Sequence, residues 1–291
     1  MHVLETIPAL REARGRLSGT VGVVPTMGAL HVGHLSLVEA ARRENDHVLV
    51  TIFVNPLQFG ANEDFDRYPR DLLADFAMLE SVGVDAVFTP TPALMYPDGF
   101  STGISVETHG LEAEHRPGHF DGVTTVVAKF FNLTQPTVAY FGQKDAQQVV
   151  VIKKMVRDLN FPLHIAVCPT LRESNGLAMS SRNRYLSEEE RAHAGTIYAG
   201  LQSAAAAYDQ GIRRAELLTD AAIHAFAPDL QVEYVSINDP ITLAPLTEAE
   251  DQPLLISTAV RLGRTRLIDN CLLPLHLNNR DDLTRILGGM L

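Results

Sequence analysis

Short apolar runs rich in β-branched residues alternate with helical patterns over roughly the first 170 residues, and this alternation constrains the fold more than any other feature. The pattern predicts strands at residues 21–25, 48–54, 86–89, 103–107, 137–141 and 163–167. It predicts helices at residues 33–43, 72–82, 123–133 and 146–159. Strands separated by helices form right-handed βαβ units, so we expect an α/β fold with a parallel sheet.

The pattern changes near the polar stretch 172–184, and we place a domain boundary near residue 175. Ser187 and Glu190 have the spacing of a capping box, which predicts a helix to about residue 208. A second helix is expected at 215–227, and strands are expected at 232–237, 254–261 and 266–269. We therefore predict two domains, a parallel α/β domain at 1–174 and a smaller α+β domain at 175–291.

Composition and charge exclude several classes of protein. Hydrophobic residues make up 46% of the 291 residues, but no apolar run reaches the roughly 18 residues of a membrane span. The net charge of −11 argues against broad binding to nucleic acid, while a small anion needs only a locally positive pocket. Without a secretion-signal pattern, Cys168 and Cys271 are expected to be reduced, packed thiols in a cytoplasmic protein.

The decade 25–34 connects a predicted strand to a predicted helix and reads Pro-Thr-Met-Gly-Ala-Leu-His-Val-Gly-His. Gly28 and Gly33 allow close backbone approach, and the free N–H groups of a helix N-terminus attract phosphate. His31 and His34 could donate hydrogen bonds to phosphate oxygens there. An isolated pair of this spacing could also be two half-buried histidines or zinc ligands, but no further Cys/His cluster has ligand spacing. The complete string favours a nucleotide-phosphate site.

Three other polar segments could join this site, because ligands of parallel sheets bind at the carboxyl ends of strands. In 142–145, Lys144 could reach phosphates, while Asp145 could cap the next helix, hold a ribose hydroxyl or hold a magnesium-bound water. In 55–60, Asn55 and Gln58 could bind a polar organic substrate or could lie in a solvated turn. Residues 179–184, called the clamp segment below, offer hydroxyls and guanidinium groups for a triphosphate or form a polar interdomain loop. Spacing alone gives no place to Tyr68, Arg116 or His119.

Six segments in order, 25–37, 53–60, 66–70, 116–123, 141–148 and 176–184, resemble the pantoate–β-alanine ligase family, the pantothenate synthetases. The resemblance covers essentially the whole chain, and the H-x-G-H string is shared with a wider nucleotidyltransferase superfamily. It implies a Rossmann-like first domain, a smaller second domain acting as a lid, and a cytoplasmic homodimer. It also implies that ATP, Mg²⁺ and (R)-pantoate give pantoyl adenylate and pyrophosphate, and that β-alanine then gives pantothenate and AMP.

The same resemblance implies roles for particular residues. The ATP-binding residues would be Met27, Gly28, Ala29, Leu30, His31, Val32, Gly33, His34, Gly142, Gln143, Lys144, Asp145, Leu171, Met179, Ser180, Ser181 and Arg182. His34 would be the proton donor, and Gln58 would contact both pantoate and β-alanine while Gln148 contacts pantoate. Where some relatives carry acidic or Gln residues after Tyr68-Pro69-Arg70, this chain has Ala74, Asp75 and Met78, so a magnesium or ribose role there is not expected.

Physical chemistry assigns the same residues to two tasks. Pantoate is already ionised, so adenylation mainly requires that charge moving onto pyrophosphate be neutralised. We expect this from Mg²⁺ and from His31, His34, Lys144, Ser180, Ser181 and Arg182, with Gln58 and Gln148 orienting the substrate. Two rival hypotheses are another H-x-G-H nucleotidyltransferase, acting on a phosphate-bearing acceptor, and a non-catalytic nucleotide-binding module.

Overall fold

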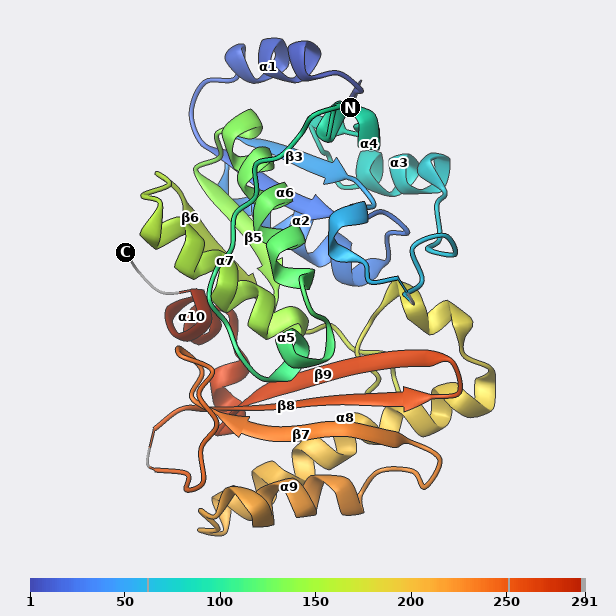
Figure 1. Ribbon diagram of the computed structural model, residues 1–291, viewed down its shortest axis with the longest axis vertical. Coiled ribbons are helices and arrows are strands. Elements are labelled where there is room, and N and C mark those ends of the chain that lie inside the picture. The colour runs from blue at the N-terminus through green and yellow to red at the C-terminus, as the bar shows by residue number, and fades with distance from the viewer. Residues whose placement is uncertain (62, 251, 289–291) are drawn as a thin grey trace.

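A computed structural model describes residues 1–61, 63–250 and 252–288. Its larger sheet has six parallel strands in the order β1-β4-β3-β2-β5-β6 (Figure 1). These strands are β1 (His2–Leu4), β4 (Ala86–Phe88), β3 (His47–Ile52), β2 (Val21–Thr26), β5 (Val138–Gly142) and β6 (His164–Cys168). Five of the six expected strands are therefore confirmed within a few residues, and β1 is an addition at the edge.

Helices cover both faces of this sheet. One face packs against α1 (Ile7–Gly15), α6 (His119–Thr134) and α7 (Ala146–Asp158), and the other packs against α2 (Val32–Glu44) and α3 (Leu72–Ser81). Alternate strand residues point to opposite layers: Val23 and Leu49 lie in the first core, while Val24 and Val50 lie in the second. This three-layer arrangement confirms the expected α/β class.

The expected strand at 103–107 is wrong, because that segment has no strand partner in the part of the chain the structure describes. Helix α6 satisfies its backbone instead: the Thr125 hydroxyl accepts the N–H of Ile104 at 2.9 Å, and the Thr124 hydroxyl donates to the Ile104 carbonyl. The apolar residues Ile104 and Val106 pack on the first core. A run that alternates like a strand can thus be a single extended segment laid along a helix.

The second sheet is antiparallel, with the order β7 (Gln231–Asn238), β8 (Leu254–Leu262) and β9 (Thr265–Leu273). Helices α8 (Glu188–Asp209) and α9 (Ala215–His224) pack on it around a core of their own. The capping box of Ser187 and Glu190 forms as expected. Figure 1 shows this sheet below the parallel one.

The end of the chain returns to the parallel sheet. After η4 (Leu275–Asn278), the short helix α10 (Arg280–Leu283) and the π-helical turn η5 (Thr284–Gly288) lie beside β6. The Thr284 hydroxyl accepts the N–H of Val167 at 3.1 Å, and Leu283 and Leu287 belong to the first core. A domain boundary near 175 remains a prediction.

Three connecting elements carry residues of interest: η1 (Pro56–Gln58), η2 (Gln143–Asp145) and η3 (Ser181–Tyr185). Two further short helices, α4 (Pro92–Met95) and α5 (Leu111–His115), precede α6. Cys168 and Cys271 are both unpaired and buried, as expected. None of the helices in the described residues is long and apolar enough to cross a membrane.

Candidate active site

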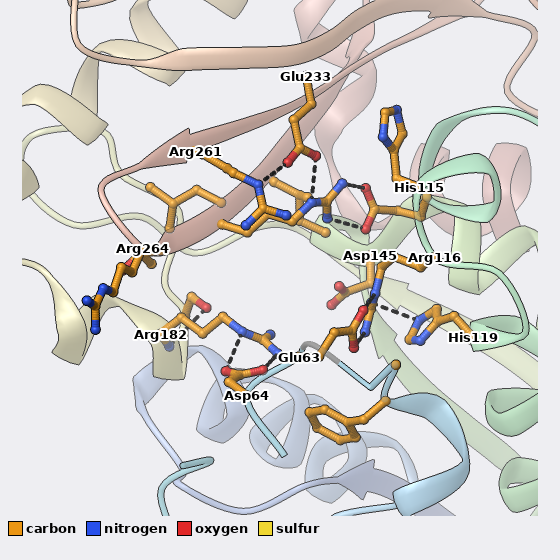
Figure 2. A pocket seen from close by; sticks show the side chains of 18 of the residues that line it. Glu63, Asp64, His115, Arg116, His119, Asp145, Arg182, Glu233, Arg261 and Arg264 are labelled. Carbon is orange, nitrogen blue, oxygen red and sulfur yellow. Dashed lines mark hydrogen bonds and ion pairs between the residues drawn. The ribbon is translucent and has the colours of Figure 1, made fainter. Parts of the chain in front are cut away.

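Residues that follow β3 and β5 line a cavity of about 850 Å³, and residues of the antiparallel sheet form its opposite wall (Figure 2). A smaller cavity of about 170 Å³ adjoins it and reaches down toward the parallel sheet. The two share several wall residues, namely Gln58, Phe59, Arg116, His119, Asp145 and Arg182. The expected convergence of the segments 25–34, 53–60 and 141–145 is confirmed, because adjacent parallel strands end at the same edge.

His31 and His34 lie next to each other at the start of α2. His31 is the N-cap, and its Nδ1 accepts the N–H of Gly33 at 3.1 Å, while Nδ1 of His34 accepts the N–H of His31 at 3.3 Å. Because each Nδ1 is an acceptor, each neutral ring carries its proton on Nε2. The pair therefore offers two Nε2–H donors from rings whose centroids are 4.0 Å apart.

Both imidazoles are neutral at physiological pH. Burial lowers the pKa of His31 to about 3, helped by His34, Lys144 and Arg184. Burial and Lys144 lower the pKa of His34 to about 4. The site can therefore donate two hydrogen bonds to an anion without carrying two imidazolium charges.

Lys144 and Asp145 form the turn between β5 and α7. Of the alternatives open for Asp145, the structure places it at the N-cap position of α7, but its carboxylate makes no capping hydrogen bond and lies 3.8 Å from the Lys144 ammonium. Asp145 borders both cavities, and Figure 2 shows its side chain among those that line the larger one. Asn270 of β9 donates to the carbonyls of Gln143 and Lys144 at 3.0 and 2.8 Å, so the second sheet fixes this turn.

Gln58, the last residue of η1, is fixed by three contacts. Its Oε1 accepts from Asn55 at 3.0 Å, its Nε2 lies 3.2 Å from Met27 Sδ, and its carbonyl accepts from His119 Nδ1 at 2.8 Å. Gly122 of α6 is required for this approach, since a Cβ there would lie 2.2 Å from the Leu57 carbonyl oxygen. The amide of Gln58 is thus a preorganised polar group on a cavity wall.

The smaller cavity combines an apolar floor with a polar rim. Its apolar lining includes Phe53, Val123, Val126, Val127, Phe130 and Phe141. Its polar lining includes His34, Asn55, Gln58, Tyr68, Gln148 and Arg182. This combination suits a small molecule with a branched hydrocarbon body and oxygen atoms at its ends.

The clamp segment lies against the H-x-G-H loop. The Ser181 hydroxyl is buried and donates to the Ala29 carbonyl at 3.0 Å, and Arg184 donates to the Leu30 carbonyl at 3.3 Å. Ser180 borders the large cavity and accepts the N–H of Arg182. Arg182 makes two parallel hydrogen bonds to Asp64, at 2.9 and 2.7 Å (Figure 2).

The cavity walls also hold charged residues to which sequence reasoning gave no role. Arg116 makes two bonds of 2.6 Å to Glu63 and approaches Nε2 of His119 at 3.1 Å (Figure 2). Arg266 of β9 donates to Glu112 of α5 at 2.5 and 2.8 Å, which joins the antiparallel sheet to α5 at the cavity wall. Glu63, Asp64 and Glu112 carry no recognisable motif, because their partners lie 53 to 154 positions away.

The remaining expected ATP residues lie behind or beside these walls. Met27 borders the smaller cavity, and Gln143 is buried beneath the turn that carries Lys144. Val32 and Leu171 are exposed, and the Leu171 carbonyl accepts the N–H of Met179 at 2.9 Å. Among the described residues, no group of three or more His, Cys, Asp or Glu is placed to hold a metal ion by itself.

Fold and cavity together define an α/β enzyme of the H-x-G-H type, with its ligand site at the carboxyl edge of a parallel sheet. A family model described as pantoate-beta-alanine ligase matches residues 2–272. The chain belongs to this family, and its reaction is the ligation that forms pantothenate.

Individual relatives agree with this assignment over their full lengths. A pantothenate synthetase of Herpetosiphon aurantiacus is 53% identical over 93% of this chain and 99% of its own. A crystal structure of the enzyme from Thermus thermophilus is 47% identical, with a TM-score of 0.89 over 93% of this chain and 98% of that one. The Francisella tularensis ligase, solved in complex with beta-gamma ATP and beta-alanine, is 36% identical, with a TM-score of 0.78 over 94% and 97% of the two chains.

Proposed function

We propose that this chain makes pantothenate in two steps through pantoyl adenylate. A carboxylate oxygen of (R)-pantoate attacks the α-phosphorus of ATP, and pyrophosphate leaves. The amine of β-alanine then attacks the acyl carbon, the amine loses a proton, and AMP leaves with the bridging oxygen. The observation that carries this proposal is the small cavity, where an apolar floor and the Gln58 and Gln148 amides lie together with His34 of the H-x-G-H string.

Pantoate fits the small cavity by its chemistry. Its two geminal methyl groups match an apolar floor such as that formed by Val123, Val127 and Phe130. Its hydroxyls match the neutral amides of Gln58 and Gln148, which donate and accept without adding charge. The carboxylate then points toward the large cavity and the start of α2, where ATP would bind.

The phosphate groups would be bound by donors from three elements. His31 and His34 give neutral Nε2–H groups, Lys144 gives an ammonium, and Ser180 and Arg182 approach from the clamp segment. The bonds to Asp64 use two of the five N–H donors of Arg182, so others can reach a phosphate. Because the pKa of His34 is lowered to about 4, we propose that it acts as a hydrogen-bond donor, with no proton released to the leaving group at neutral pH.

The other ATP residues would act mainly through their backbone. Gly28, Ala29, Leu30, Val32 and Gly33 build the loop and the helix start around the histidines. Gly142 and Gln143 shape the turn before Lys144, and the Leu171 carbonyl accepts the N–H of Met179, the first residue of the clamp segment. Substrate contacts by these residues remain part of the proposal.

Magnesium would be bound mostly by phosphate oxygens, since Mg²⁺ in such sites needs only one or two protein carboxylates. Asp145 fits that requirement, because its carboxylate borders both cavities and lies 3.8 Å from the Lys144 ammonium. The ion would neutralise negative charge that develops on pyrophosphate. A cytoplasmic homodimer is also part of this proposal, and light scattering on the purified chain measures the subunit number.

Product analysis tests the proposal. Purified protein is incubated with ATP, MgCl₂, (R)-pantoate and β-alanine, and products are separated by chromatography. Equal amounts of AMP and pantothenate, with pyrophosphate, support it. ADP and phosphate, or a dinucleotide formed with a phosphate-bearing acceptor, contradict it, and nucleotide binding without turnover would favour a non-catalytic module.

A further inference from the structure

Asp75 of α3 is an almost fully buried carboxylate, with 2% of its surface exposed. Its Oδ2 accepts the N–H of Ala29 at 3.0 Å, and its Oδ1 accepts the N–H of Leu30 at 2.7 Å. These two residues immediately precede His31, the N-cap of α2. One side chain therefore binds two consecutive peptide groups of the H-x-G-H loop.

The loop needs such an acceptor because its backbone conformation is unfavourable. Gly28 has a φ of 81° and Ala29 a φ of 50°, and a non-glycine residue rarely adopts this left-handed region. Because the chain turns here, the N–H groups of Ala29 and Leu30 point away from the neighbouring strands. A buried N–H group without another partner would cost the free energy of a hydrogen bond. Burial raises the pKa of Asp75, and the two N–H donors oppose that shift in part, so they offset some of the cost of burying the carboxylate.

The carbonyls of the same two residues are held from the opposite side. Ser181 binds the Ala29 carbonyl and Arg184 binds the Leu30 carbonyl, both from the clamp segment. Residues 29 and 30 are thus fixed between α3 and η3, with every backbone N–H and C=O of the pair bonded. Few alternative positions remain for His31, which follows directly.

We propose that Asp75 is a positioning residue for the phosphate site, fixing residues 29 and 30 so that His31 and His34 present their Nε2–H groups to ATP. This inference rests on the proposed function, because it assigns a task within that site. Asp75 itself contacts the backbone of the loop and lines neither of the two cavities. Its effect reaches the reaction only through the geometry of the loop.

The variant Asp75→Asn tests this inference, with Asp71→Ala as the matched control. Asn is nearly isosteric but has one acceptor oxygen for two N–H donors. Asp71 caps the same helix through the N–H of Ala74 at 3.1 Å, so its loss weakens α3 without touching the loop. Binding of the non-hydrolysable analogue α,β-methylene ATP is measured by calorimetry, and adenylation is measured as pyrophosphate release.

For Asp75→Asn we expect analogue affinity and the adenylation kcat each to fall about tenfold, the scale of one lost charge-assisted hydrogen bond, with the KM for β-alanine unchanged. For Asp71→Ala we expect a lower melting temperature and unchanged analogue affinity and kcat. If Asp75→Asn lowers only the melting temperature, the inference is wrong. If the wild-type protein fails to bind the analogue, the proposed function fails instead.

Amide hydrogen exchange on the wild-type chain decides the question if Asp75→Asn does not fold. The N–H groups of Ala29 and Leu30 should exchange slowly without added nucleotide, because the buried carboxylate holds them. Exchange at the rate of an exposed loop would overturn the inference.

Discussion

Nδ1 of His34 accepts the backbone N–H of His31 at 3.3 Å, and this bond leaves the Nε2 atom of His34 as the hydrogen donor. His31 repeats the arrangement with Gly33 at 3.1 Å. The histidine pair therefore has two separable functions, capping α2 with one ring nitrogen and donating to an anion with the other. Two substitutions of His34 can divide them.

His34→Asn keeps an acceptor near the Nδ1 position and removes the donor at Nε2, while His34→Gln does the reverse. We expect His34→Asn to fold normally but to slow pyrophosphate release by on the order of 10²-fold, the scale for a lost preorganised donor. His34→Gln should retain more activity and lose more thermal stability, and His34→Ala should lose both. Similar rates for the Asn and wild-type enzymes would remove His34 from the charge role.

Lys144 should contribute to adenylation through its charge. Lys144→Ala is expected to slow pyrophosphate release by on the order of 10²-fold or more and to leave the fold intact. Lys154→Ala is the matched control, because Lys154 pairs with Asp158 on the exposed part of the following helix. Equal rates for the two variants would count against any phosphate contact by Lys144.

Gln58 should distinguish among the substrates. Gln58→Ala is expected to raise the KM values for pantoate and β-alanine several-fold, because it removes an amide held by Asn55 and Met27 at the small cavity. The affinity for ATP should stay unchanged and serves as the internal control. An unchanged KM for pantoate would place that substrate elsewhere.

His119 should make the fold sensitive to acid. Burial and the nearby Arg116 lower its pKa from 6.5 to about 4, although Gln58, Glu63 and Glu112 oppose that shift. Between these values the unfolded chain binds more protons than the folded one, so stability falls as the pH falls from about 6.5 to about 4. A shift of this size corresponds to about 3 kcal/mol.

His119→Asn isolates that contribution, since its amide can still donate to the Gln58 carbonyl but cannot titrate. Urea unfolding at a series of pH values should show the stability advantage of wild type over His119→Asn shrinking as the pH is lowered through this window. A constant difference between the two proteins would contradict the pKa shift. Protonation of His31 and His34 acts in the same direction in both proteins and therefore cancels.

The parallel sheet and much of the site were predictable because both follow from local patterns. Residues 21–26 and 47–52 are mostly apolar runs. Strands of a parallel sheet end at one edge, so Met27, Gln58 and Asp145 had to come near one another. The sequence predicted this helix from residue 123, so the first turn of α6 was missed. That turn begins after Gly118, whose φ of 77° ends the preceding turn, and Gly118 gives no apolar signal for a helix start.

The ion pairs of the site could not be predicted from one sequence. Asp64 and Arg182 lie 118 positions apart, and each alone is typical of a solvated loop. Asp75 was expected to have no magnesium or ribose role, but nothing in its helix indicated that it faces the H-x-G-H loop. Such contacts depend on how helices and strands pack against one another, and the hydrophobic periodicity of the sequence does not predict that packing.

Isotope transfer tests the two-step mechanism most directly. The enzyme is incubated with ATP, MgCl₂, β-alanine and (R)-pantoate that carries ¹⁸O in both carboxylate oxygens. The masses of the products are then measured by mass spectrometry. Attack of the carboxylate on the α-phosphorus predicts one ¹⁸O in AMP and one in pantothenate, with unlabelled pyrophosphate. Label in inorganic phosphate, or unlabelled AMP, would contradict pantoyl adenylate as the intermediate.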